Sequence, residues 1–219
     1  MNTTDYRLRC TAAALCCLLL TGCGGYHKGK TKGSVYRNSA AGFRLDTPDG
    51  FTVIPADSYE QLASYQTAKQ QAAERNVSDH FVCEYAAQGS DCEILICSEP
   101  NINNDTTEAF LIRICNRLRN EETGFEVREL DELRRGKAEF KTAHIAAHAQ
   151  LLHHHDGEEA HEESEADSSE SSGSEPDTTQ MRLYVTAADE NYVYLLITYP
   201  AGNAGETQKQ MLLDSIHNP

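Results

Sequence analysis

The chain has 219 residues, and 34 aspartates and glutamates against 19 lysines and arginines give it a formal net charge of −15. Nucleic acid is not an expected partner, because binding phosphates requires a basic face that releases counterions, and the sequence offers none. The length suffices for one domain of common size, or for one domain with a long insertion.

The first residues have the three regions of an export signal. Arg7 and Arg9 supply positive charge, and an apolar run from Cys10 to Leu20 follows without an acidic residue. As a helix this run would be about 16 Å long, whereas crossing a bilayer takes roughly 30 Å. The run is therefore typical of a targeting segment.

The tetrapeptide Leu20-Thr21-Gly22-Cys23 resembles the lipobox of bacterial lipoproteins. The resemblance implies that residues 1–22 are a signal peptide that is removed and that Cys23 carries acyl chains such as palmitate. Each buried CH₂ contributes about 0.8 kcal/mol, so two or more chains would hold the protein in membrane lipid. The expected location is the extracytoplasmic face of the cell membrane or outer membrane.

Residues 23–38 predict the lipidated cysteine and a flexible basic tether. The stretch is rich in Gly, Lys, Ser and Thr and has no apolar period. Its basic residues, Lys28, Lys30, Lys32 and Arg37, would lie close to anionic headgroups, with about 1 kcal/mol of attraction each. A plain soluble spacer is the equally open alternative.

Residues 39–219 are predicted to form a single α+β domain with an antiparallel sheet flanked by helices, because hairpins dominate and few helices separate strands. The expected elements, in chain order, are a hairpin of Phe43–Leu45 and Phe51–Val53 around the turn Thr47–Gly50, a helix from Asp57 or Ser58 to about Asn76, strands at Phe81–Ala87 and Cys92–Cys97, a helix from Asp105 or Thr106 to about Asn120, strands at Phe125–Leu133, Lys137–Gln150, Gln180–Ala187 and Tyr192–Tyr199, and a helix from about Ala204 to Ile216.

The clearest of these elements is the helix that begins at Asp105 or Thr106. Its apolar residues recur at the spacing of a core-facing stripe. They are Phe110, Leu111, Ile114, Cys115 and Leu118. Cys115 is thus expected in the core rather than at a reactive site.

Residues 152–179 form a low-complexity insertion with ten acidic residues, four histidines and no lysine or arginine. Such a stretch has too little apolar surface to offset its ordering entropy, so disorder is expected. Without the insertion the two flanking strands could join as a hairpin, which places it at a loop tip.

The histidines of this insertion are the candidate metal ligands. They are His153, His154, His155 and His161, with Asp156 beside them. Neutral imidazole and carboxylate together suit Zn²⁺, Ni²⁺ or Cu²⁺. A solvated acidic loop without metal is the competing interpretation.

Four cysteines remain in the predicted mature chain: Cys83, Cys92, Cys97 and Cys115. An even number outside the cytoplasm permits disulfides in three connectivities. With a three-residue turn between their strands Cys83 faces Cys97, and with a two-residue turn it faces Ile96. The second register sorts apolar from charged side chains better and slightly disfavours a bridge between Cys83 and Cys97.

Residues 42–51 read G-F-x-L-x-x-P-x-G-F and precede a mid-chain helix, four strands and a closing helix. This order resembles PsbP-like and DcrB-like lipoproteins, which implies an α/β/α sandwich and a non-enzymatic binding or accessory protein at a membrane. The expected partners are membrane lipid through Cys23 and a protein of the cell envelope. The alternatives are metal capture by the histidine-rich insertion and, since no catalytic motif stands out, an enzyme of unrecognised type.

Overall fold

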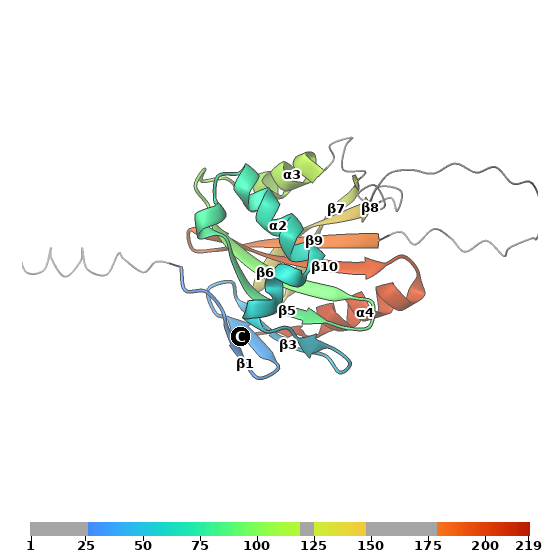
Figure 1. Ribbon diagram of the computed structural model, residues 1–219. Coiled ribbons are helices and arrows are strands. Elements are labelled where there is room, and N and C mark those ends of the chain that lie inside the picture. The colour runs from blue at the N-terminus through green and yellow to red at the C-terminus, as the bar shows by residue number, and fades with distance from the viewer. Residues whose placement is uncertain (1–25, 119–124, 148–178) are drawn as a thin grey trace, which may run out of the picture.

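The computed structural model of the protein describes residues 26–118, 125–147 and 179–219 (Figure 1). The predicted signal peptide, Cys23 and all of the predicted insertion except Thr179 lie outside the described residues. Within the described ranges no helix combines the length and apolar character that a membrane span requires.

Seven strands form one sheet, in the order β4-β5-β6-β10-β9-β8-β7. All neighbouring pairs in it are antiparallel. The strands are β4 (Thr52–Val53), β5 (Val82–Gln88), β6 (Glu93–Pro100), β7 (Phe125–Arg135), β8 (Ala138–Ala147), β9 (Thr179–Ala188) and β10 (Asn191–Pro200).

A second, smaller antiparallel sheet has the order β1-β2-β3-β11. Its strands are β1 (Lys30–Lys32), β2 (Val35–Asn38), β3 (Phe43–Asp46) and β11 (Ile216–His217). Leu45 of β3 pairs with Ile216 of β11, so this sheet joins the two ends of the described chain.

The helices lie on both faces of the large sheet. They are α2 (Ala63–Glu74), α3 (Thr107–Leu118) and α4 (Asn203–Asp214), with short 3₁₀ turns η1 (Ala56–Gln61) and η2 (Ser78–His80). Helices α2 and α3 cover one face, and α4 and the small sheet lie against the other (Figure 1).

Each face of the large sheet has its own apolar core. On the face under α2 and α3, all five residues of the predicted stripe on α3 are buried, as the spacing predicts. On the opposite face, Tyr36, Phe43 and Leu45 of the small sheet pack with Leu212 and Ile216 from the end of the chain. Successive side chains of the central strands point to opposite faces of the sheet and so pack alternately in the two cores.

The predicted α+β class with antiparallel strands flanked by helices is confirmed. The strands on either side of the predicted insertion pair directly, with Ala146 of β8 opposite Gln180 of β9. The predicted helices at residues 105–120 and 204–216 correspond to α3 and α4.

The predicted hairpin around Thr47–Gly50 is wrong. A turn does form there, closed by the Phe51 N–H, which donates to Pro48 O at 3.1 Å. The strands before and after this turn, however, belong to different sheets. Phe43 belongs to β3 of the small sheet and Val53 to β4 of the large one. Short apolar segments on both sides of a turn do not by themselves specify which strand each will pair with.

The predicted helix from Asp57 to Asn76 is interrupted. Leu62 has an extended backbone, with φ −87° and ψ 126°, and separates η1 from α2. Its side chain is buried in the core under α2 and α3. The apolar stripe of this stretch is thin, so burial of one leucine overrides helix continuity.

Candidate functional site

The N-terminal segment, residues 26–32, is docked on the domain through Glu84 of β5. The Glu84 carboxylate accepts hydrogen bonds from the Tyr26 hydroxyl and the Gly29 backbone N–H, both at 2.6 Å. It also accepts one from the Tyr36 hydroxyl at 2.7 Å. Hydrogen bonds to an ionised acceptor are roughly twice as strong as those between neutral groups.

This docking differs from the flexible tether predicted for residues 23–38. From Tyr26 onward the chain is held, and Thr31 of β1 pairs with Tyr36 of β2. The segment lacks apolar periodicity, but polar bonds to a distant carboxylate and strand pairing offset its ordering entropy.

Asn38 completes the hydrogen-bond network around Glu84. Its Nδ2 donates to the hydroxyls of Tyr26 at 2.8 Å and of Tyr36 at 3.1 Å, and its Oδ1 accepts from Ala41 N–H at 2.8 Å. Burial, reinforced by Glu84, raises the pKa of both tyrosines well above the ordinary value. Both hydroxyls therefore stay protonated and donate to the carboxylate at neutral pH.

A β-bulge places Glu84 in this network. The pairing of β5 with β6 shifts between Cys83 and Tyr85, so Glu84 is the extra residue. Tyr85 packs in the core beneath the small sheet, and Cys83 packs against the core beneath α2 and α3. Glu84 points to the same side as Tyr85, because the bulge interrupts the alternation of a regular strand.

Gly29 is the residue that allows the N-terminal segment to approach so closely. A Cβ atom at this position would collide with the ring of Tyr36. The Gly29 N–H reaches Glu84 over the edge of that ring. Only glycine permits this approach without displacing the tyrosine.

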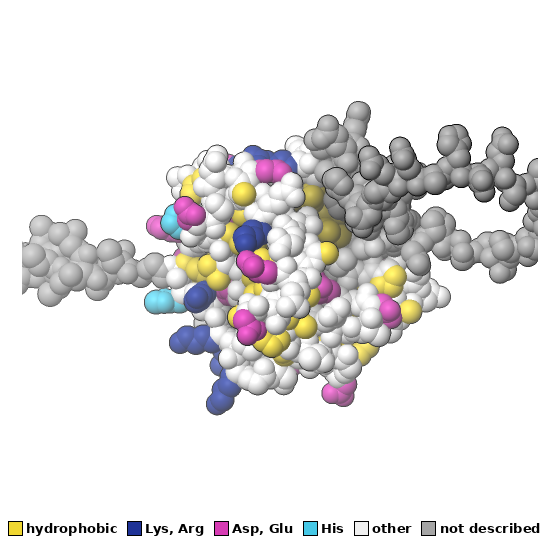
Figure 2. All heavy atoms as spheres, in the orientation of Figure 1, with side chains coloured by type: hydrophobic (Ala, Val, Ile, Leu, Met, Phe, Trp, Pro, Cys, Tyr) yellow, Lys and Arg dark blue, Asp and Glu magenta, His cyan; other side chains and the backbone are white. Residues whose placement is uncertain are grey.

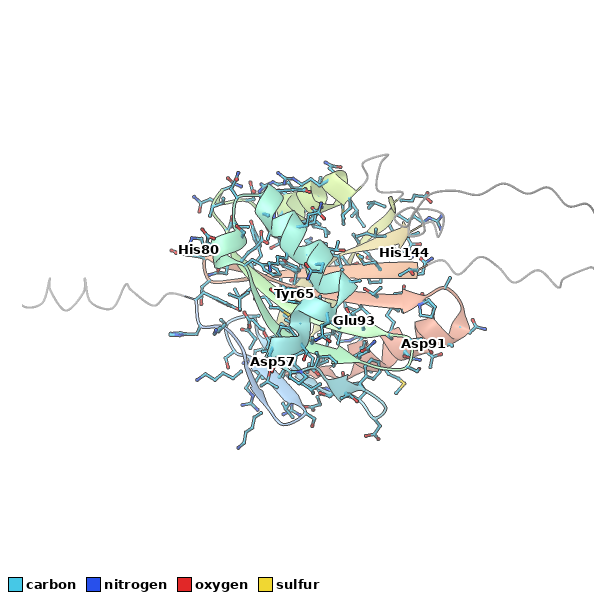
Figure 3. The ribbon with its side chains drawn as sticks, viewed as in Figure 1. Asp57, Tyr65, His80, Asp91, Glu93 and His144 are labelled. Carbon is cyan, nitrogen blue, oxygen red and sulfur yellow. The ribbon has the colours of Figure 1, made fainter. Side chains whose placement is uncertain are left out.

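A pocket of about 470 Å³ opens beside the docked segment. Its lining contains two lysines and two histidines but no acidic residue; the lining residues are Tyr26, His27, Lys28, Lys30, His80, Val82, Ser98 and Asn191. Figure 2 shows lysine and arginine side chains gathered at this end of the molecule, and Figure 3 labels the exposed His80 there. We call this the basic pocket.

The basic pocket has the chemistry of an anion site. Lys28 and Lys30 are exposed cations, and Ser98 and Asn191 add a hydroxyl and an amide at its wall. The Glu84 carboxylate below is already engaged by its donors. A phosphate or carboxylate group would meet donors on several sides.

A second carboxylate, more deeply buried than Glu84, lies on the opposite face of the large sheet. Glu99 of β6 forms a two-pronged ion pair with Arg75, with Arg75 Nε to Oε1 at 2.9 Å and Nη2 to Oε2 at 2.5 Å. Both side chains are almost fully buried, 4% and 2% exposed. This pair fixes the end of α2 to the sheet.

The predicted metal ligands His153, His154, His155, Asp156 and His161 lie outside the described residues, so metal capture there stays a prediction. Among residues 26–118, 125–147 and 179–219, no three histidine, cysteine or acidic side chains gather as a metal site.

His144, upstream of the insertion, is on strand β8. Its ring contacts Gln180 Oε1 at 2.5 Å. Burial lowers the pKa of His144, so the ring is predominantly neutral at pH 7.

No family model and no curated protein matches the sequence. Among solved structures, the chain is similar to LpqN of Mycobacterium tuberculosis, which is involved in cell envelope biogenesis, with a TM-score of 0.44 and 9% identity over 88% of this chain and 90% of LpqN. It is also similar to CyanoP, the cyanobacterial PsbP of Synechocystis, with a TM-score of 0.45 and 9% identity over 90% of this chain and all of CyanoP. It is similar as well to the yeast Ran-binding protein Mog1p, with a TM-score of 0.41 and 12% identity over 87% of this chain and 95% of Mog1p. At these values the likeness concerns the arrangement of the backbone alone.

Proposed function

We propose that this protein is a lipid-anchored extracytoplasmic lipoprotein whose domain is a non-enzymatic binding module with its basic pocket turned toward the membrane. The lipobox-like residues Leu20 to Cys23 support cleavage and acylation at Cys23. The basic pocket then serves to bind anionic groups at the membrane surface, and the rest of the domain is left to contact a protein of the envelope.

The observation that carries this proposal is the docking of Tyr26. Two residues, Gly24 and Gly25, lie between Cys23 and Tyr26, and three steps along an extended chain span at most about 10 Å. Tyr26 is fixed to Glu84 and Asn38, so an acyl chain on Cys23 would hold this end of the domain against the headgroups. A flexible tether of sixteen residues, by contrast, would leave the domain free to turn.

The charge of this end fits an anionic surface. Lys28, Lys30, Lys32 and Arg37 are all exposed. Each basic residue near an anionic bilayer contributes about 1 kcal/mol, and the effect fades within a Debye length of about 8 Å. Docking of the segment keeps these charges inside that range.

Acylation is tested with the full chain and its Cys23→Ser variant in bacteria fed an alkyne analogue of palmitate. We expect label and membrane sedimentation for the natural chain and neither for the variant. Label that persists in Cys23→Ser, or a natural chain without label, would remove the anchor from the proposal.

The basic pocket is tested separately with protein that begins at Gly24, so that no acyl chain contributes. We expect binding to vesicles of phosphatidylcholine with phosphatidylglycerol and little to phosphatidylcholine alone. Changing Lys28 and Lys30 to Gln should abolish the difference. The matched control changes Lys69 of α2 and Lys141 of β8, which also removes two charges, and should bind as the natural protein does. Equal loss in both pairs would contradict a specific membrane-facing site.

A further inference from the structure

Two cysteines lie directly opposite each other on neighbouring strands of the large sheet. Cys83 of β5 pairs with Cys97 of β6 in the register, although neither uniform register expected from the turn length applies along the whole hairpin. Near the turn Tyr85 pairs with Ile96, and the bulge at Glu84 then brings Cys83 opposite Cys97.

The register places this pair within the range that a disulfide can span. Directly opposed residues of antiparallel strands have Cα atoms about 4.5–5.5 Å apart, within the roughly 4.4–6.8 Å that a disulfide spans. The two side chains leave the sheet on the same face, under α2 and α3, and the thiols are hydrogen-bonding neighbours. In the structure both thiols are free, and the Cys83 Sγ donates to Tyr85 O at 3.6 Å, so the pair is reduced and placed for oxidation.

The other two cysteines of the described chain occupy different surroundings. Cys92 lies before β6 and packs in the core beneath the small sheet, on the other face from Cys97. Cys115 lies on α3, in the core under the helices. Of the pairs these positions allow, only Cys83 with Cys97 are opposed across neighbouring strands.

We propose that Cys83 and Cys97 form a disulfide in the mature protein and that this bond holds the bulge that presents Glu84. The bond in the cell rests on the proposed extracytoplasmic location, because disulfides persist in oxidising compartments and are rare in the cytosol. It makes docking of the N-terminal segment depend on the redox state of the sheet.

The oxidant that the reaction requires is a second disulfide, of a protein or small molecule. Cys83 is partly exposed and Cys97 fully buried, and burial raises the pKa of the Cys97 thiol, so the Cys83 thiolate attacks first. A mixed disulfide forms and one oxidant sulfur leaves. Cys97 sulfur then attacks Cys83 sulfur and expels the second. Two electrons and both protons pass to the oxidant, which ends as two thiols.

The bond would affect docking of the N-terminal segment because Cys83 is the immediate neighbour of Glu84 in the chain. Cys83 and Tyr85 flank Glu84, and Tyr85 is fully buried. A covalent link at Cys83 therefore leaves the Glu84 carboxylate little freedom to move from Gly29 and Tyr26. Without the link, β5 could slip by one residue and draw the carboxylate away.

The bond is tested in vitro on the full chain, reduced in detergent and then equilibrated with excess oxidised glutathione. After acid quenching, remaining thiols are alkylated and peptides are mapped by mass spectrometry. We expect a peptide pair linked through Cys83 and Cys97 in the natural chain and in the Cys92→Ala control. Cys97→Ala should instead carry glutathione on Cys83. Free thiols at both positions, or a link to Cys92 or Cys115, would overturn the proposal.

The effect on docking is read by hydrogen exchange. The Gly29 amide should exchange more slowly in the oxidised than in the reduced chain, and the Cys83→Ala variant should show no such difference. The amide of Ala109 on α3, which donates to the Thr106 hydroxyl just before the helix at 3.1 Å, is the internal control and should not change. Equal exchange of Gly29 in both redox states would separate the bond from the segment and overturn its proposed role.

A final arm traps thiols in living bacteria with a membrane-permeant alkylating reagent before lysis. Protection of Cys83 and Cys97 there supports the bond in the mature protein. If the bond forms in vitro but both thiols are free in cells, the bond in the cell and the extracytoplasmic location are both overturned. The in-vitro bond would still show that the two cysteines are placed to form a disulfide.

Discussion

Two carboxylates, the half-buried Glu84 and the buried Glu99, lie on opposite faces of the large sheet and are stabilised in different ways. Glu99, under α2, is paired with a cation, and its two oxygens meet the guanidinium of Arg75. Glu84, under the small sheet, is surrounded by neutral donors, the hydroxyls of Tyr26 and Tyr36 and the Gly29 N–H. Both are satisfied, yet they connect very different parts of the chain.

The two carboxylates differ in how much structure must open before their partners can leave them. Arg75 follows directly on α2, so the Glu99 pair opens only if a helix leaves the sheet. Two of the four donors to Glu84, the Tyr26 hydroxyl and the Gly29 N–H, come from residues 26–32, a segment with no apolar core of its own. The other two belong to Tyr36 and Asn38. Local opening costs least where few apolar contacts are lost. One carboxylate thus stabilises the fold, whereas the other determines whether its N-terminal end is docked.

The largest expected effect is that of Arg75→Met. The change leaves the Glu99 charge buried without its cation, which should lower the free energy of unfolding by about 3–5 kcal/mol. Urea denaturation measures it. The double variant Arg75→Met with Glu99→Leu should recover most of this loss, because the uncompensated charge is gone. A single variant within about 1 kcal/mol of the natural protein would contradict a dry ion pair.

A smaller and more local effect is expected for Glu84→Ala. Two tyrosine hydroxyls and an amide lose their acceptor, so we expect a loss of about 2–3 kcal/mol and faster tryptic cleavage after Lys28 and Lys30. Glu190→Ala, at an exposed position between β9 and β10, is the control and should change neither. Unchanged cleavage in Glu84→Ala would show that another contact docks the segment.

Tyr26→Phe should remove a single donor from Glu84 and cost about 1 kcal/mol in urea denaturation. The ring remains to pack against the core beneath the small sheet, so cleavage after Lys28 should increase less than in Glu84→Ala. Tyr65→Phe, on α2 across the sheet, is the matched control. A loss as large as that of Glu84→Ala would mean that Tyr26 alone docks the segment.

The smallest effect concerns Glu93, a carboxylate that has neither a cation beside it, as Glu99 has, nor several donors around it, as Glu84 has. Ser64 Oγ donates to it, and burial raises its pKa. A raised pKa means that the folded protein binds the proton more tightly, so the stabilising contribution is present below the unfolded pKa and lost as pH rises through the folded pKa.

Glu93→Gln should therefore be slightly more stable than the natural protein at pH 7, and the gap should close near pH 4. Thermal unfolding at both values measures it. Glu60→Gln, whose side chain is 70% exposed, is the surface control for the loss of one carboxylate. A gap for Glu93→Gln that widens in acid would contradict the direction of the shift.

The elements with a regular pattern of apolar residues could be predicted from the sequence. Five apolar residues at helical spacing located α3 and its buried face, and the strands predicted at residues 180–187 and 192–199 correspond to β9 and β10. The docked N-terminal segment was missed because its stability comes from a carboxylate 58 positions away from Tyr26, and no local pattern records a contact of that separation.

The pairing of Cys83 with Cys97 was one of two registers that the sequence left open, and the slight preference for the other register was wrong. Turn length gave two uniform registers, but the bulge at Glu84 changes the register midway along β5. A glutamate inside the apolar run Phe81 to Ala87 was the available signal, since a charge in the middle of a buried strand requires a local explanation.

Strand β10 also sets a distance within the molecule. Its first residue, Asn191, lines the basic pocket, and its last, Pro200, pairs with Thr179, where the chain returns from the acidic stretch. Ten extended residues separate those ends by about 30 Å, several Debye lengths at physiological salt. The attachment point of the acidic stretch and the basic pocket thus lie at opposite poles of the sheet. An anionic surface that meets the basic pocket is therefore well beyond the range of screened repulsion from that attachment point.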